Sequence, residues 1–370
     1  MSGLRNAVVS GAVVLLAEVA YGQRLPDTVV PEHYTLTLQP NLDNATFIGH
    51  EQIDVTVKQP VDSITLNAAE IQFASVEAEI EGHQALGKVT QDEQKQQATF
   101  NFGQTIPAGS LTLIIVYHGK LNNELRGFYL SRAGNHKLAV TQFEPTDARR
   151  AFPSFDEPAF KATFDLTVIA PQGDMVIANT NQVSDEPGPY GGEHTVHFAT
   201  TPKMSTYLVA FLVGDFQCIS GQSDGTPIRV CGTPDKVQYG KFALSAAEYI
   251  LHYYNTYFGI RYPMPKLDLI GIPDFEAGAM ENFGAITYRE TDLFVDDATA
   301  TVGAKKNVAE VVAHEMAHQW FGDMVTMQWW NNIWLNEGFA TWMSNKPVAA
   351  WHPEWHVPQD VAAGLNGTLD

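Results

Sequence analysis

The sequence has few basic residues, only two cysteines and, outside its first 22 residues, no long hydrophobic run. Its 22 lysines and arginines are outnumbered by 42 aspartates and glutamates, which gives a formal net charge of −20. Such a surface offers no general positive field to nucleic acid or anionic lipid. With no apolar run of about 18 residues in the body of the chain, no internal membrane span is expected. Hydrophobic residues still make up 45% of the 370 positions, which predicts a folded protein, and the length predicts two domains, or one large domain and a piece of another.

Residues 1–22 have the pattern of a cleavable secretory leader. Arg5 precedes an apolar run over residues 7–17, and Ala20 and Gly22 are small residues at the positions that a signal peptidase reads. The leader predicts a secreted or periplasmic protein, with no stable membrane span after its removal. An N-terminal helix that stays with the fold is the alternative.

The two cysteines, Cys218 and Cys231, flank a polar stretch over residues 220–227 that is typical of a turn between two strands. Opposed hairpin positions in an oxidising compartment allow a disulfide. Two buried thiols are the alternative, and neither cysteine has the surroundings of a catalytic nucleophile.

Two regions follow the leader. Over residues 23–225, short runs of alternating polar and apolar residues are separated by turn residues, which predicts an antiparallel β-rich domain. Over residues 226–370 the pattern changes to α+β. We expect helices near residues 237–257, 306–321 and 334–344 and a strand at 267–272, listed here with their approximate bounds. The predicted fold class is therefore α+β with more than one domain.

The predicted helix near residue 314 carries a candidate metal site. His314 and His318 are four residues apart and share one helix face, so both imidazoles can reach one ion. Glu315 lies beside them, where it can contact a water on that ion. Glu337, 19 residues after His318, is the candidate third ligand, because aromatic and aliphatic neighbours surround it in the sequence. A surface glutamate is the alternative.

Two histidines, one glutamate and one open position form the ligand set of zinc hydrolases rather than of structural zinc sites. Zinc would lower the pKa of a bound water and polarise a carbonyl, and Glu315 would accept the proton of the water. His352 and His356 are also four residues apart, but no third ligand accompanies them, and a helix start at Pro353 explains that segment better.

The segment over residues 275–284 is rich in glycine and alanine and contains two glutamates. An extended peptide could pair with such a segment as an added strand, and a carboxylate at its end would bind a free α-ammonium group. A plain loop is the alternative that the residues alone leave open.

Several motifs occur together in a fixed order: 141–158, 257–268, Gly278–Asn282 (GAMEN), His314–His318 (HEMAH) and 329–339 with Glu337. In this combination the chain resembles the M1 family of zinc aminopeptidases from about residue 25 to its end. The resemblance implies a β-rich N-terminal domain followed by a thermolysin-like zinc peptidase domain, which is incomplete at its C-terminus.

The resemblance also implies roles for individual residues. His314, His318 and Glu337 would hold one Zn²⁺ per chain, and Glu315 would be the general base. The implied substrate-binding residues are Gln142, Glu144, Gly278, Ala279, Met280, Glu281 and Asn282. Among them, Glu281 and Glu144 would bind the α-ammonium group, Gln142 would line the first side-chain pocket, and the backbone of Gly278 and Ala279 would hold the substrate main chain. The implied partners are peptides with a free N-terminus.

Two departures from the family pattern matter. Asn332 stands where the family usually has an aspartate, so the sequence names no partner for the zinc-binding histidines except Asp323, a candidate. The family also places an oxyanion-stabilising tyrosine about 60 residues after the third ligand. No tyrosine follows Tyr288 here.

Three functions remain open at this point. The first is a zinc aminopeptidase represented by its N-terminal part. The second is a zinc- or peptide-binding chain without turnover, which the missing tyrosine favours. The third is a zinc endopeptidase, which two ammonium-binding carboxylates would disfavour. The sequence does not indicate the oligomeric state or the side-chain preference.

Overall fold

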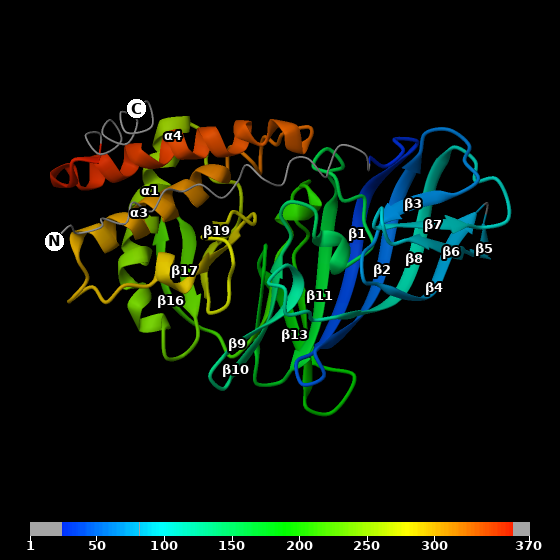
Figure 1. Cartoon of the computed structure of the whole chain (residues 1–370), viewed down its shortest axis with the longest axis horizontal. Helices are drawn as coiled ribbons and strands as arrows, with labels where there is room; N and C mark the ends of the chain where they lie inside the picture. The colour runs from blue at the N-terminus through cyan, green and yellow to red at the C-terminus, as the bar shows by residue number, and fades with distance from the viewer. Residues whose placement is uncertain (1–23, 81, 358–370) are drawn as a thin grey trace, which may run out of the picture.

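The structure of the protein is a computed structural model that describes residues 24–80 and 82–357. The predicted leader, residues 1–22, lies outside the described residues, and so does the end of the chain from residue 358. Figure 1 shows two regions side by side: one built from strands, and one in which helices cover a sheet. A continuous cluster of buried apolar side chains runs through both regions.

The N-terminal region consists of three sheets. The largest has eight strands in the order β13-β14-β11-β1-β2-β8-β4-β5, the second has the order β12-β15-β10-β9, and the third has the order β3-β7-β6. The bounds of the strands are β1 Val29–Asn41, β2 Thr46–Val57, β3 Ile64–Asn67, β4 Gln72–Ile80, β5 His83–Leu86, β6 Lys88–Asp92, β7 Gln97–Asn101, β8 Gly109–Lys120, β9 Gly127–Ala133, β10 His136–Gln142, β11 Thr163–Pro171, β12 Met175–Ala178, β13 Gln182–Pro187, β14 Glu193–Phe198 and β15 Phe211–Gly214.

Side-chain alternation explains these strands. In β1, Tyr34, Leu36 and Leu38 are fully buried, whereas the threonines between them are partly exposed. This period of two places one face of the strand in the core, as the sequence predicts. Among the strands of the N-terminal region, the pairing is antiparallel except between β1 and β11, which run parallel. Parallel neighbours need a long connection, and here β2 to β10 lie between the two strands in the sequence.

The second region combines a five-stranded sheet, in the order β16-β17-β18-β20-β19, with four α-helices among the described residues. The bounds are β16 Gln217–Ser223, β17 Thr226–Gly232, β18 Leu267–Ile272, β19 Ala279–Met280, β20 Ala285–Arg289, α1 Lys241–Phe258, α2 Glu290–Leu293, α3 Val302–His318 and α4 Trp334–Trp351. Every residue of β18 is buried, because β18 lies between parallel neighbours and helices cover the sheet. In the part of the chain that the structure describes, no helix is long and apolar enough to span a bilayer.

The hairpin β16–β17 belongs to the second region, since β17 pairs with β18. The expected boundary at residues 225 and 226 coincides with the turn of this hairpin, whereas the chain passes from one set of sheets to the other between Gly214 and Gln217. Cys218 and Cys231 are opposite each other in the hairpin register and form a disulfide.

Candidate functional site

Helix α3 supplies two imidazoles to the candidate metal centre. The helix begins after Thr301, whose side chain accepts a hydrogen bond from the backbone N–H of Ala304. Four residues of separation place His314 and His318 on one face, with their Nε2 atoms 3.0 Å apart. His318 is fully buried. The helix therefore brings two nitrogen donors to one point, as the spacing predicts.

Glu337, in the first turn of α4, completes this group. Its Oε2 atom lies 3.2 Å from Nε2 of His314 and 3.6 Å from Nε2 of His318. One ligand atom from each of the three side chains lies within 4.8 Å of the others. Two neutral imidazoles and a carboxylate suit zinc, so the residues present fit the metal that the resemblance implies.

The apolar environment expected around Glu337 is not found among the described residues. Its neighbours on α4 are largely exposed: Trp334 is 61% exposed and Trp342 is 55% exposed. These side chains lie on the outer face of the helix, because only residues such as Ala340 and Met343 pack inward. Burial alone would raise the pKa of Glu337, but its hydrogen bonds to His314 and His318 outweigh burial and hold this pKa well below the usual range.

A backbone carbonyl orients His318. The Nδ1 atom of His318 lies 3.0 Å from the carbonyl oxygen of Phe321, so the ring donates there and leaves Nε2 free for a metal. Asp323, the candidate that the sequence suggests, does not take this role. Only its backbone N–H is bonded to His318, at the carbonyl oxygen, and its buried carboxylate oxygens have no hydrogen-bond partner among the described residues.

Glu315 lies beside the metal-binding pair and is 7% exposed. It forms a second compact group with His318 and Glu281, in which the ligand atoms again lie within 4.8 Å of one another. Burial raises the pKa of the Glu315 carboxyl well above its usual range; His318 opposes this and Glu281 adds to it. A carboxylate with a raised pKa next to a metal-ligand set is suited to accept a proton.

Carboxylates from both regions converge on the same place. Glu144, Glu281 and Glu337 form a third group within 4.8 Å, although Glu144 follows β10 and Glu281 follows β19. Burial raises the pKa of Glu144 well above its usual range, and the charges of Glu281 and Glu337 raise it further. Three acidic side chains this close repel one another, so a bound cation would stabilise them.

The segment Gly278–Asn282 includes a two-residue edge strand and is not a plain loop throughout. Ala279 and Met280 form β19, which pairs antiparallel with β20, and Gly278 is exposed, with only an ordinary contact to Asp292 beside its Cα atom. Glu281 reaches the carboxylate cluster. The side chains of Met280 and Asn282 instead lie in the interior, where the Asn282 amide donates to the hydroxyl of Thr287 at 3.1 Å. These two buried side chains therefore anchor the segment in the protein interior.

Gln142, the last residue of β10, is 9% exposed, and its Oε1 atom has no hydrogen-bond partner among the described residues. It lies two positions before Glu144, whose carboxylate is in the cluster. The structure also brings in Gln319, which sequence reasoning missed. Its amide donates to the Glu281 carbonyl at 2.9 Å, and its Oε1 accepts from the Gly284 N–H at 3.1 Å. The only signal was its place directly after His318.

The second histidine pair has no metal-site geometry. Nδ1 of His352 bonds Glu354, and its ring stacks on Trp355. Neither His352 nor His356 belongs to a group of three ligating side chains in the described part of the chain.

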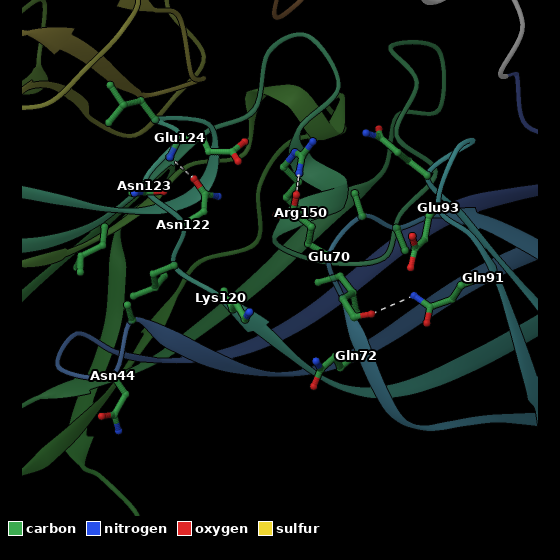
Figure 2. Close-up of a pocket in the computed structure, with 18 of the residues that line it drawn as sticks. Asn44, Glu70, Gln72, Gln91, Glu93, Lys120, Asn122, Asn123, Glu124 and Arg150 are labelled. Atoms are coloured by element: carbon green, nitrogen blue, oxygen red, sulfur yellow. Dashed lines mark hydrogen bonds and ion pairs between the residues drawn. The ribbon is translucent and has the colours of Figure 1, made fainter.

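A cavity of about 1160 Å³ lies in the N-terminal region, away from the histidines. Figure 2 shows its polar lining, in which the Gln91 amide donates to the Ile71 carbonyl and Arg150 lies beside Glu70. None of the metal-binding candidates lines this cavity, so the large cavity is not the candidate metal site. Its wall does include Arg132 and Asp274, which meet at the contact between the two regions.

Comparison with known proteins agrees with this arrangement. Residues 30–208 match the peptidase M1 N-terminal domain, and residues 242–367 match the peptidase family M1 domain. The chain is 45% identical to Aminopeptidase 2 of Candida albicans over 338 residues, and 44% identical to Aminopeptidase M1-A of Oryza sativa over 354 residues. These alignments cover 90% and 92% of the chain but only 36% and 40% of those relatives, so the chain spans well under half of their length.

A third relative has nearly the same extent as this chain. Aminopeptidase N of Acetobacter pasteurianus is 44% identical over 330 residues, which are 88% of this chain and 92% of that protein. With both domain profiles matched in order and the two histidines and Glu337 brought together, the chain belongs to peptidase family M1.

Proposed function

We propose that this protein is a zinc aminopeptidase that removes the N-terminal residue of peptides. The observation that carries the proposal is the cluster formed by Glu144, Glu281 and Glu337 directly beside His314 and His318. A metal-ligand set alone would suit any zinc hydrolase. Additional buried carboxylates next to it provide a site for the α-ammonium group of a peptide.

The residues divide the work as follows. His314, His318 and Glu337 would hold the zinc, which would supply a Lewis acid and a water of lowered pKa. Glu315 accepts the proton of the attacking water and returns it to the leaving amine. Glu281 and Glu144 bind the substrate ammonium, which sets the first peptide bond against the reacting groups.

The sheet edge at Ala279, with the exposed Gly278 before it, is suited to hold the substrate main chain by strand addition. Glu144 comes from the N-terminal region and borders the cluster on one side. A substrate with further residues before the scissile bond would therefore run into these carboxylates. This supports cleavage at the N-terminus over cleavage within a chain.

The test compares L-leucine p-nitroanilide with its N-acetylated counterpart. We expect turnover of the free amine only, loss of activity with a chelator and recovery with zinc. Glu315→Gln should lower kcat by about 10²–10⁴-fold, as for loss of a general base. His352→Ala is the matched control, because it removes a histidine outside the site. Equal turnover of both substrates would refute the aminopeptidase.

We also propose that the protein acts in an oxidising compartment, outside the cytoplasm. The support is the Cys218–Cys231 disulfide together with the leader-like pattern of residues 1–22. Cell fractionation combined with N-terminal sequencing of the mature protein tests this, and a cytoplasmic protein with an intact N-terminus would overturn it.

A further inference from the structure

The segment that leads to β19 and Glu281 is tied to the N-terminal region at Asp274. Asp274 makes three hydrogen bonds to β9 there: its carboxylate accepts from the Arg132 N–H at 2.9 Å, its N–H donates to the Ser131 hydroxyl at 3.2 Å, and its carbonyl accepts from the Tyr129 hydroxyl at 2.8 Å. Ser131 and Tyr129 are fully buried. One residue therefore bonds three of the four positions from Tyr129 to Arg132 on the facing strand.

The same hairpin leads to the other side of the ammonium site. Strand β9 pairs along its whole length with β10, from His136 opposite Ala133 to Gln142 opposite Gly127. The chain leaves β10 at Gln142 and reaches Glu144 two residues later. Asp274 thus connects the segment of Glu281 to the hairpin that positions Glu144.

A second tie lies after Glu281. The Asn179 amide, from the end of β12, donates to the Phe283 carbonyl at 2.9 Å and to the Leu208 carbonyl at 2.8 Å. Within the second region, Arg289 holds the segment by its side chain at the carbonyls of Phe275 and Glu276, and by its backbone at Gly278. The segment between the two ties is consequently fixed against both regions.

We propose that Asp274 is a positioning residue that fixes the distance between Glu281 and Glu144, and thereby the affinity of the site for a substrate α-ammonium group. The inference rests on the proposed function, because it assumes that these carboxylates bind the ammonium. It adds a residue outside the cluster: Asp274 contacts neither the metal ligands nor the substrate, and acts through the strand that follows it.

Removal of the Asp274 carboxylate should loosen the segment without touching α3. In Asp274→Ala the Arg132 N–H loses its acceptor, whereas the geometry of His314, Glu315 and His318 is unchanged. We therefore expect KM for an aminoacyl substrate to rise about tenfold with kcat nearly constant. In Asp274→Asn the amide oxygen can accept the same hydrogen bond, so this variant should be close to the unchanged protein.

The experiment uses the full chain and three measurements. The first is KM and kcat on L-leucine p-nitroanilide. The second is calorimetric binding of L-leucinamide to the metal-depleted protein, with N-acetyl-leucinamide as the blank. The third is hydrogen exchange of the peptide that spans residues 275–283. Asp43→Ala is the matched control. Asp43 is also an aspartate bound to this hairpin, through an ion pair with Lys137, but that ion pair does not involve residues 275–283. Tyr129→Phe is a second, milder variant that removes one bond and keeps the ring.

Support requires faster exchange in residues 275–283 and weaker leucinamide binding in Asp274→Ala, recovery in Asp274→Asn, a smaller change in Tyr129→Phe and none in Asp43→Ala. A lower thermal midpoint with unchanged exchange and binding would mean a merely structural role and would overturn the inference. If the unchanged protein binds leucinamide and Asp274→Ala binds it equally well, the inference alone fails. If the unchanged protein does not bind leucinamide, the proposed function fails and the inference falls with it.

Discussion

The amide of Gln319 donates to the backbone carbonyl of Glu281 at 2.9 Å. This bond joins the residue that follows the candidate metal ligand His318 to the backbone of the ammonium-binding candidate, directly after β19. The Oε1 atom of Gln319 accepts from the Gly284 N–H at the other end of the same turn. A single buried side chain therefore holds the two halves of the site in register.

We predict that Gln319→Ala destabilises the protein. Two buried backbone groups would lose their partners, at a cost of about 1–3 kcal/mol for each. Urea unfolding followed by tryptophan fluorescence measures this. Gln104→Ala, at an exposed position, is the control and should change the unfolding free energy little. Equal midpoints for the two variants would contradict the role given to Gln319.

Zinc content should depend on the three converging side chains. His314→Ala, His318→Ala and Glu337→Gln each remove one ligand of a three-ligand set, so we expect the bound zinc to fall from about one per chain to a small fraction. Elemental analysis after dialysis gives this directly. His356→Ala should keep the zinc, and zinc retained in all three site variants would place the metal elsewhere.

The stability of the protein should fall in acid through Asp268. This buried carboxylate accepts from Lys266 at 2.7 Å and from Arg229 at 2.7 and 2.6 Å. Burial opposes its ionisation, but Lys266 and Arg229 outweigh burial and hold the pKa of Asp268 below its usual value. A lowered folded-state pKa contributes stability above the unfolded value, about pH 4, and this contribution disappears as the pH falls through the folded-state pKa.

Asp268→Asn tests this linkage. It should destabilise the protein at pH 7, and its difference from the unchanged protein should shrink as the pH falls below about 4. Thermal unfolding across pH 3–7 provides the comparison. A difference that stays constant across this range would show that the charge of Asp268 is not responsible.

The disulfide should stabilise the β16–β17 hairpin and the sheet it joins. Cys218 and Cys231 are separated by 13 positions, and closing a loop of that size contributes about 2–3 kcal/mol. We expect the double variant Cys218→Ser, Cys231→Ser to unfold at lower urea. A reductant should lower the midpoint of the unchanged protein to that of the variant, and should leave the variant unaffected.

Local spacing was sufficient to predict several features from the sequence. His314 and His318 share a face because residues four apart do so in any α-helix, and Cys218 and Cys231 oppose each other because a short turn sets the register of a hairpin. The change from β-rich to α+β structure also follows from periodicity. One exception is the parallel pair β1–β11, because alternation along a strand does not reveal the direction of its neighbour.

Tertiary structure decided everything that depends on segments far apart in the chain. Glu144 meets Glu281 because the β9–β10 hairpin packs against the second region, and Asp274 makes that contact. The partner of His318 is a backbone carbonyl, which no side-chain pattern reveals, and the exposed outer face of α4 was not visible in its apolar composition. Sequence determined which two histidines share one helix face as candidate metal ligands, since helix geometry is local. Only the packing of two regions determined how the carboxylates around them are spaced, because that spacing rests on hydrogen bonds between residues more than a hundred positions apart.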